Sequence, residues 1–151
     1  MAPLVVLVVV TLVARVIGLF GVGYVDTVAE SVAVGLAAMF VMTSSAHFVQ
    51  PRRAGLIAIV PPAVPRPALA VTITGVLELA GAIGLLVPPD VVPGIRPAAA
   101  IGLALMLVAM FPANVFAAGE RRHPDAPHTP LPLRTAIQAV FLAATLVVLW
   151  A

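Results

Sequence analysis

The stretch Ala68–Val87, ALAVTITGVLELAGAIGLLV, contains twenty residues and a single ionisable side chain, Glu78. A transmembrane helix needs about 20 mostly apolar residues to cross the hydrocarbon core of a bilayer. Valine, isoleucine and threonine would favour a strand in water, but in lipid every backbone N–H and C=O must be satisfied within the segment. The run is also continuous, without the alternation of a membrane strand. It therefore predicts a membrane-spanning helix with one acid near its middle.

Four further runs of this kind fill most of the 151 residues. The chain is 62% hydrophobic and 9% charged, which leaves too little polar surface to cover a water-soluble domain. We therefore expect an all-α membrane protein, with residues 1–151 forming one transmembrane domain in the lipid bilayer. The first run is too long for a signal peptide and is expected to remain as a span. The five predicted spans are Pro3–Tyr24, Ser31–Val49, Ala68–Val87, Pro97–Ala118 and Arg134–Trp150.

Composition excludes several classes of chemistry. Cysteine is absent, so the chain forms no disulfide and performs no thiol catalysis of its own. The net charge of +2 is spread over membrane loops, and we expect no nucleic acid partner. His123 and His128 lie in a loop with acids and prolines, so neither haem nor a metal ion is expected.

Arginine placement predicts the orientation. Alternating spans put the second and fourth loops on one side with the N-terminus, and cytoplasmic loops are enriched in Lys and Arg. We expect a multi-pass protein of the bacterial inner membrane, with its N-terminus cytoplasmic and its C-terminus outside. The segment Gln50–Pro67 contains either a short helix at the interface, beginning at Arg52, or an ordered loop. The side with the N-terminus carries Arg52, Arg53, Arg66, Arg121, Arg122 and Arg134, whereas the opposite side carries Arg96 alone.

Glu78 is expected to face the interior of the helix bundle. Thr74, Gly75 and Gly81 lie one turn away, and small residues let another helix approach closely. In this setting the carboxyl group is protonated, paired with a cation, or hydrogen bonded to neutral donors. Arg15 comes out at a similar depth in the first span, so we predict a structural ion pair between Arg15 and Glu78. An acid at this depth either has a function or joins helices.

The remaining polar residues of the spans suggest a pocket. They gather in the cytoplasmic third, with Glu78 and Thr74 deeper, and predict a polar pocket that opens toward the cytoplasm. Each member also has a structural explanation. Pro112 is expected to kink the fourth span, so Asn114 can satisfy the freed backbone groups, and Arg134 can anchor a helix at the interface. The candidate ligand-binding residues are His47, Thr74, Glu78, Asn114, Arg134 and Gln138.

Five short segments, taken in order, resemble the DoxX-like family of small bacterial membrane proteins. The resemblance covers roughly residues 31–150. It implies a four-helix transmembrane bundle, to which Pro3–Tyr24 adds an N-terminal helix. The matching segments are Ala46-His47-Phe48, Ile59–Pro65, Thr74–Glu78, Phe111-Pro-Ala-Asn114, and Leu133-Arg134 with Gln138.

The resemblance also implies a class of function. The family takes its name from a subunit associated with a quinone-linked sulfur oxidoreductase, and its relatives are linked to redox functions. It implies a small-molecule-binding or accessory subunit of a membrane redox system, with a redox partner protein and a quinone-like ligand rather than catalysis by this chain. Two other readings remain open, a non-catalytic scaffold or assembly factor for a membrane partner and a small transporter or proton pathway. Formation of a homo-oligomer also remains open.

Overall fold

The computed structural model describes residues 1–150, and all of its regular elements are helices. Five helical segments are long and apolar enough to cross a membrane, with α5 and α6 together forming the fourth. The predicted all-α, five-span fold is therefore confirmed. In chain order the elements are α1 (Ala2–Leu19), η1 (Gly23–Val25), α2 (Val28–Phe48), α3 (Arg52–Ala58), α4 (Pro67–Leu86), α5 (Ile95–Ala109), α6 (Phe111–Ala118) and α7 (Leu131–Val148).

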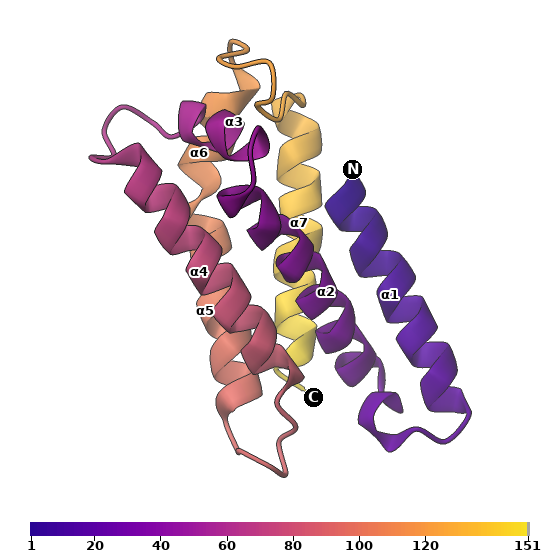
Figure 1. The fold of residues 1–151 in the computed structure, drawn as a ribbon. Helices are drawn as coiled ribbons and strands as arrows, with labels where there is room; N and C mark the ends of the chain where they lie inside the picture. The colour runs from indigo at the N-terminus through magenta and orange to yellow at the C-terminus, as the bar shows by residue number, and fades with distance from the viewer. Residues whose placement is uncertain (151) are drawn as a thin grey trace.

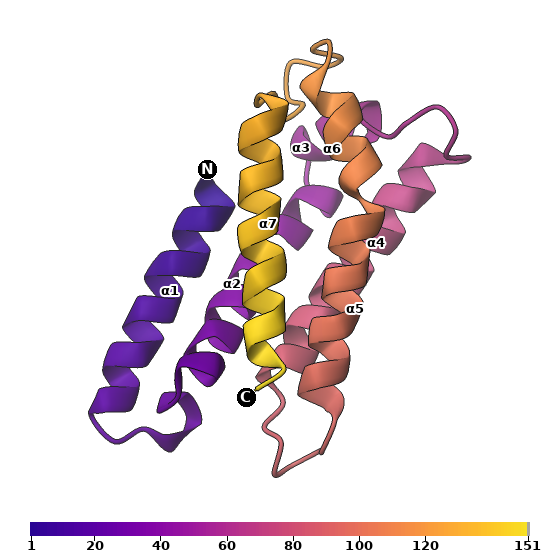
Figure 2. The ribbon, with the colours of Figure 1, turned by 180° about the vertical axis from the view of Figure 1, so that it is seen from behind.

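Four of the long helices form a closed ring. α2 packs against α4, α4 against α5, α5 against α7, and α7 returns to α2. α1 lies outside this ring and packs extensively only against α2 (Figures 1 and 2). This arrangement is the expected four-helix bundle with one additional N-terminal helix.

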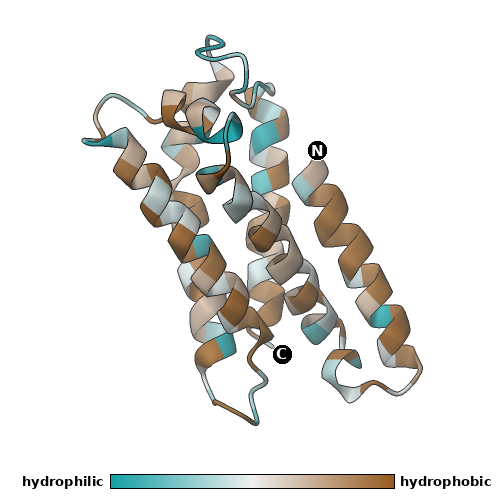
Figure 3. Ribbon diagram, viewed as in Figure 1, coloured by the Kyte–Doolittle hydropathy of each residue, from teal (hydrophilic) through white to brown (hydrophobic). Residues whose placement is uncertain are grey.

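The bundle is apolar inside and on most of its outer surface. Its core includes Leu36, Phe40, Leu85 and Leu103, each at most 2% exposed. Only 17% of the α1 span is buried, so most of its apolar side chains point outward, as suits contact with lipid. Hydrophilic residues gather at the end of the bundle that carries α3 and the loop before α7 (Figure 3). We call this end the arginine-rich end.

The start of α2 is set by a reciprocal cap. Thr27 accepts a hydrogen bond from the Glu30 N–H at 3.1 Å, and the Glu30 carboxylate accepts one from the Thr27 N–H at 3.0 Å. This capping box satisfies two N–H groups that the first turn leaves free, so α2 begins three residues before the predicted Ser31. α1 ends at Leu19, earlier than the predicted Tyr24, because the chain turns at Gly21 with a φ of 92°.

The fourth span is interrupted between Ala109 and Phe111. Pro112 has no N–H to donate to the preceding turn, and its ring disfavours a continuous helix. The structure divides the span into α5 and α6 at Met110, which confirms the predicted kink. Of the two alternatives for Gln50–Pro67, the structure has the short helix that begins at Arg52, as α3.

Candidate functional site

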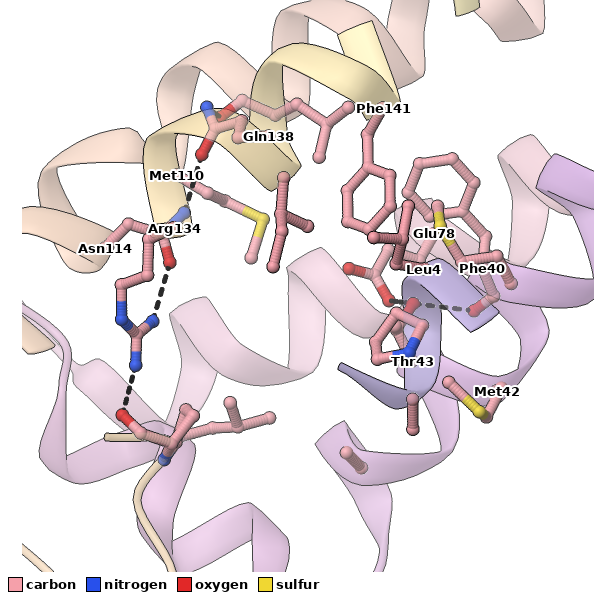
Figure 4. Close-up of a pocket in the computed structure, with 18 of the residues that line it drawn as sticks. Leu4, Phe40, Met42, Thr43, Glu78, Met110, Asn114, Arg134, Gln138 and Phe141 are labelled. Carbon is pink, nitrogen blue, oxygen red and sulfur yellow. Dashed lines mark hydrogen bonds between the residues drawn. The ribbon is translucent and has the colours of Figure 1, made fainter. Parts of the chain in front are cut away.

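A cavity of about 480 Å³ lies inside the arginine-rich half of the bundle. It is lined by α2, α3, α4 and α7, by the region around the α5–α6 break, by the loop before α7, and by the first turn of α1. Five of the six predicted ligand-binding residues line it, and Figure 4 labels four of them, Glu78, Asn114, Arg134 and Gln138. These five are His47, Glu78, Asn114, Arg134 and Gln138.

The first polar wall of the cavity is built around Glu78, which is 5% exposed. Thr43 on α2 donates a hydrogen bond to Glu78 Oε2 over 2.9 Å. His47 Nε2 lies 3.6 Å from Glu78 Oε1, close enough for an ion pair but longer than a hydrogen bond. Glu78 therefore meets two polar side chains from α2, one on each carboxyl oxygen.

The hydrogen bond of His47 Nδ1 determines the tautomer of the ring and leaves Nε2 facing Glu78. Its Nδ1 lies 2.8 Å from the Val71 carbonyl oxygen, which can only accept, so Nδ1 carries a proton. A neutral ring then presents the Nε2 lone pair toward Glu78, where an ionised carboxylate would repel it. The contact is favourable when one proton is held on either Glu78 or His47 Nε2. The wall is thus suited to accept or donate a proton.

Thr74 supports this wall from behind rather than lining the cavity. Its Oγ1 lies 3.2 Å from His47 Nδ1 and also donates to backbone carbonyls of its own helix. Thr74 therefore orients the imidazole without reaching the cavity itself. Gly75 permits this packing, since a Cβ at Gly75 would lie 2.5 Å from the His47 Cβ.

The second polar wall is a chain of three side chains from α6 and α7. Arg134 Nη1 donates to Asn114 Oδ1 over 3.1 Å, and Asn114 Nδ2 donates to Gln138 Oε1 over 2.6 Å. Gln138 Nε2 continues to the Leu107 carbonyl oxygen at 2.8 Å, on the last turns of α5. The chain thus joins α5, α6 and α7 across the break in the fourth span.

This second wall keeps unused hydrogen-bond donors. A guanidinium has five N–H donors, and Arg134 uses one each toward Asn114, Thr129 and Pro127. Asn114 and Gln138 each have a second amide hydrogen beyond the bonds described above. The wall therefore offers N–H donors to a ligand, and it lies opposite the wall that contains Glu78 and His47.

Apolar side chains separate the two walls. Met110 and Phe141 lie between them, and Phe40 and Leu4 lie beside Glu78 (Figure 4). A flat apolar molecule with polar groups at opposite ends would be complementary to this arrangement.

The arginine-rich end of the cavity is covered by α3 and the loop before α7. A Cβ on Gly55 would lie 2.3 Å from the Asp125 carbonyl oxygen, so helix and loop are in direct backbone contact. Arg134 holds the same loop through the Thr129 carbonyl at 2.9 Å and the Pro127 carbonyl. The sequence predicted a pocket that opens toward this end, and α3 and the loop contribute lining residues there.

The predicted ion pair between Arg15 and Glu78 was wrong. Arg15 Nη1 donates to the Asp26 carbonyl oxygen at 2.7 Å, beyond the far end of α1. Glu78 instead contacts Thr43 and His47, while the part of α1 that reaches the cavity is its first turn. Depth estimates alone could not show that α1 packs against α2, outside the ring that holds α4.

Two features of the structure were missed by sequence reasoning. Thr43, one turn before His47 on α2, is a direct partner of Glu78, and the four-residue spacing was the available signal.

Arg96 was assigned to a loop but lies in the first turn of α5 and is 2% exposed. Its Nε donates to the Leu85 carbonyl at 3.1 Å, and its guanidinium stands 5.6 Å from the Tyr24 ring centre. Arg96 thus closes the C-terminal end of α4 and lies outside the cavity.

A protein-family model matches residues 36–151 and is described as a domain of unknown function (DUF8561). The chain belongs to this family. The DUF8561 match covers most of α2 and all of the later helices, and it contains every predicted ligand-binding residue. It does not extend over α1. No curated protein and no solved structure matches the chain. The matching family is DUF8561 and not the DoxX-like family that the sequence resembles.

Proposed function

We propose that this DUF8561 protein is a DoxX-like accessory subunit of a membrane redox system that binds a quinone-like molecule in the cavity between Glu78 and Arg134. The observation that carries the proposal is the pair of polar walls on opposite sides of an apolar space of about 480 Å³. Quinones are flat, apolar rings with a carbonyl oxygen at each end. Such a ring needs an apolar slot and a hydrogen-bonding group for each oxygen.

The two walls would act differently on the two oxygens. The donors of Arg134, Asn114 and Gln138 suit a carbonyl oxygen, which only accepts hydrogen bonds. The Glu78–His47 pair suits the opposite oxygen in both redox states, since it can donate to a carbonyl or accept from a hydroxyl. The absence of cysteine means that electrons would reach the ligand from a partner protein rather than from a thiol of this chain.

Replacing Glu78 by glutamine tests this assignment. The amide keeps the shape of the side chain and its contacts with Thr43 and His47, but it cannot exchange a proton. We expect quinone affinity to fall about tenfold or more, the size of a lost hydrogen bond to a charged group at roughly 1.5–3 kcal/mol. The measurement is the quinone that remains bound after gentle purification, quantified by extraction and mass spectrometry.

The matched control is Glu30→Gln, because glutamine also completes a capping box and Glu30 lies outside the cavity. Glu30→Gln should retain as much quinone as the wild type. Equal retention by Glu78→Gln, or no quinone in the wild type, would contradict the proposal. An empty cavity together with a stable membrane protein partner would favour the scaffold alternative instead.

We also propose that the arginine-rich end faces the cytoplasm. Arg52, Arg53 and Arg66 lie in or beside α3 and the connection to α4, and Arg121 and Arg122 lie in the loop before α7. These segments share one end of the bundle in Figure 1. Positive charge is enriched on the cytoplasmic side of bacterial membrane proteins, which supports this orientation.

Single cysteines in this cysteine-free chain test the orientation. Glu120→Cys lies in the arginine-rich loop and Asp90→Cys lies in the loop at the opposite end, and both positions are exposed acids. We expect a membrane-impermeant maleimide to label Asp90→Cys on intact cells and to label Glu120→Cys only after the membrane is opened. The reverse pattern would show the opposite orientation.

A further inference from the structure

The cavity is not enclosed by tight helix–helix packing on every side, and the side between α1 and α7 is the exception. Leu4 of α1 and Ile137 and Phe141 of α7 all line it. α1 nevertheless packs extensively only against α2 and the short η1 helix, so no tight helix–helix interface closes the side between α1 and α7.

The outer surface beside this side is apolar. Met1 is 70% exposed and Val5 is 56% exposed, and they flank Leu4 in the first turns of α1. Both belong to or adjoin a candidate membrane span, so the surface next to the cavity is one that hydrocarbon would cover. The arginine-rich end, by contrast, is covered by backbone contacts between α3 and the loop, and Arg134 holds that loop in place.

We propose that the cavity opens sideways into the bilayer between the first turn of α1 and α7, and that its ligand is an amphipathic lipid-soluble molecule with one apolar tail. The compact polar head would occupy the space between the Glu78 and Arg134 walls. The tail would leave past Leu4 and Ile137 into the hydrocarbon. This inference rests on the proposed function and adds the class of ligand, its orientation and its route of entry.

The side chains of the first turn of α1 are the reason for a tail. Polar side chains line the cavity from α2, α3, α4, α6, α7 and the loop before α7, whereas the side chains that α1 contributes are all apolar. These are Met1, Ala2, Pro3 and Leu4. An apolar tail is complementary to these side chains.

The test compares two ligands on one substituted protein. One ligand is a tail-less dimethoxybenzoquinone, and the other is the same ring with a decyl chain. Leu4→Trp places a bulky ring in the proposed opening. We expect the decyl compound to bind about tenfold more weakly to Leu4→Trp than to the wild type, by calorimetric titration in detergent, with the tail-less ring changed less than about twofold.

Leu12→Trp is the matched control, because Leu12 is 61% exposed on α1 and does not line the cavity. It should leave the affinities of both ligands unchanged. Ile137→Trp repeats the test from the α7 side, should Leu4→Trp fail to give folded protein.

The outcomes separate this inference from the proposed function. Selective weakening of the decyl compound supports the sideways opening. Equal weakening of both ligands, or of neither, overturns the opening but leaves a quinone site in place. Failure of the wild type to bind either quinone overturns the proposed function, and the inference with it.

Discussion

Replacing Gly75 by leucine is expected to remove most of the folded protein. Gly75 lies where α4 meets α2, and a Cβ there would stand 2.5 Å from the His47 Cβ and 2.9 Å from its Cγ. These atoms belong to the root of a buried side chain, so they cannot move away as a flexible tip could. Overpacking typically costs about 1–3 kcal/mol, and leucine adds further atoms beyond the Cβ. We expect a clear fall in the apparent melting temperature, measured as loss of the monodisperse peak in detergent after heating.

Gly102→Leu is the matched control for this substitution. Gly102 is also inside a long helix, but a Cβ there would meet no atom within 4 Å. Leucine is the better helix former by up to about 1 kcal/mol, so Gly102→Leu should match or exceed the wild type in stability. Gly75→Ala should fall between Gly75→Leu and the wild type. A Gly75→Leu protein as stable as Gly102→Leu would show that α2 and α4 do not pack as described.

Replacing Arg134 by methionine is expected to abolish quinone binding and to loosen the loop before α7. The guanidinium bonds Asn114 Oδ1 at 3.1 Å, the Thr129 carbonyl at 2.9 Å and the Pro127 carbonyl. Methionine keeps much of the length of the side chain but makes none of these bonds. A hydrogen bond to a charged group contributes roughly 1.5–3 kcal/mol, so the loss of three is large even if water replaces some. Limited proteolysis within residues 119–130 should become faster than in the wild type.

Two further variants separate the geometry of Arg134 from its charge. Lysine keeps the charge but not the planar fork, and it cannot reach three acceptors in the same directions, so Arg134→Lys should rescue binding only in part. Arg121→Met removes an arginine of the same loop that bonds only the Pro124 carbonyl, at 2.6 Å. It should leave quinone binding unchanged. Full binding by Arg134→Met would show that this wall does not hold the ligand.

Hydropathy was sufficient to predict the helices, because in lipid the backbone has few alternatives to a helix. The boundaries of α4 differ from the predicted Ala68–Val87 by one residue at each end. The larger errors occur where side chains or turns act locally. The Thr27–Glu30 cap extends α2, and the turn at Gly21 shortens α1. Both effects depend on single residues, and a hydropathy value averaged over a whole span does not detect them.

The cluster of cavity residues could be predicted because polar side chains in a membrane helix tend to face other polar groups. His47, Glu78, Asn114, Arg134 and Gln138 do come together, whereas their role in binding remains a prediction. The partners within the cluster could not be predicted, since they depend on which helices are neighbours and how each is rotated. Arg15 lies on a helix outside the four-helix ring, and hydropathy does not predict which helices form that ring.

The contacts of α1 are unevenly distributed along its length. Its far end is clamped, where Arg15 bonds the Asp26 carbonyl at 2.7 Å and a Cβ on Gly18 would stand 2.0 Å from the Val25 carbonyl oxygen. The middle of α1 is held by α2, because a Cβ on Gly35 would stand 2.8 Å from the Leu7 carbonyl oxygen. The turn that carries Leu4 lies beyond both of these contacts. Membranes of different thickness tilt hydrophobic helices by different amounts. The lipid around this protein would therefore change the mobility of that turn more than the shape of the four-helix ring.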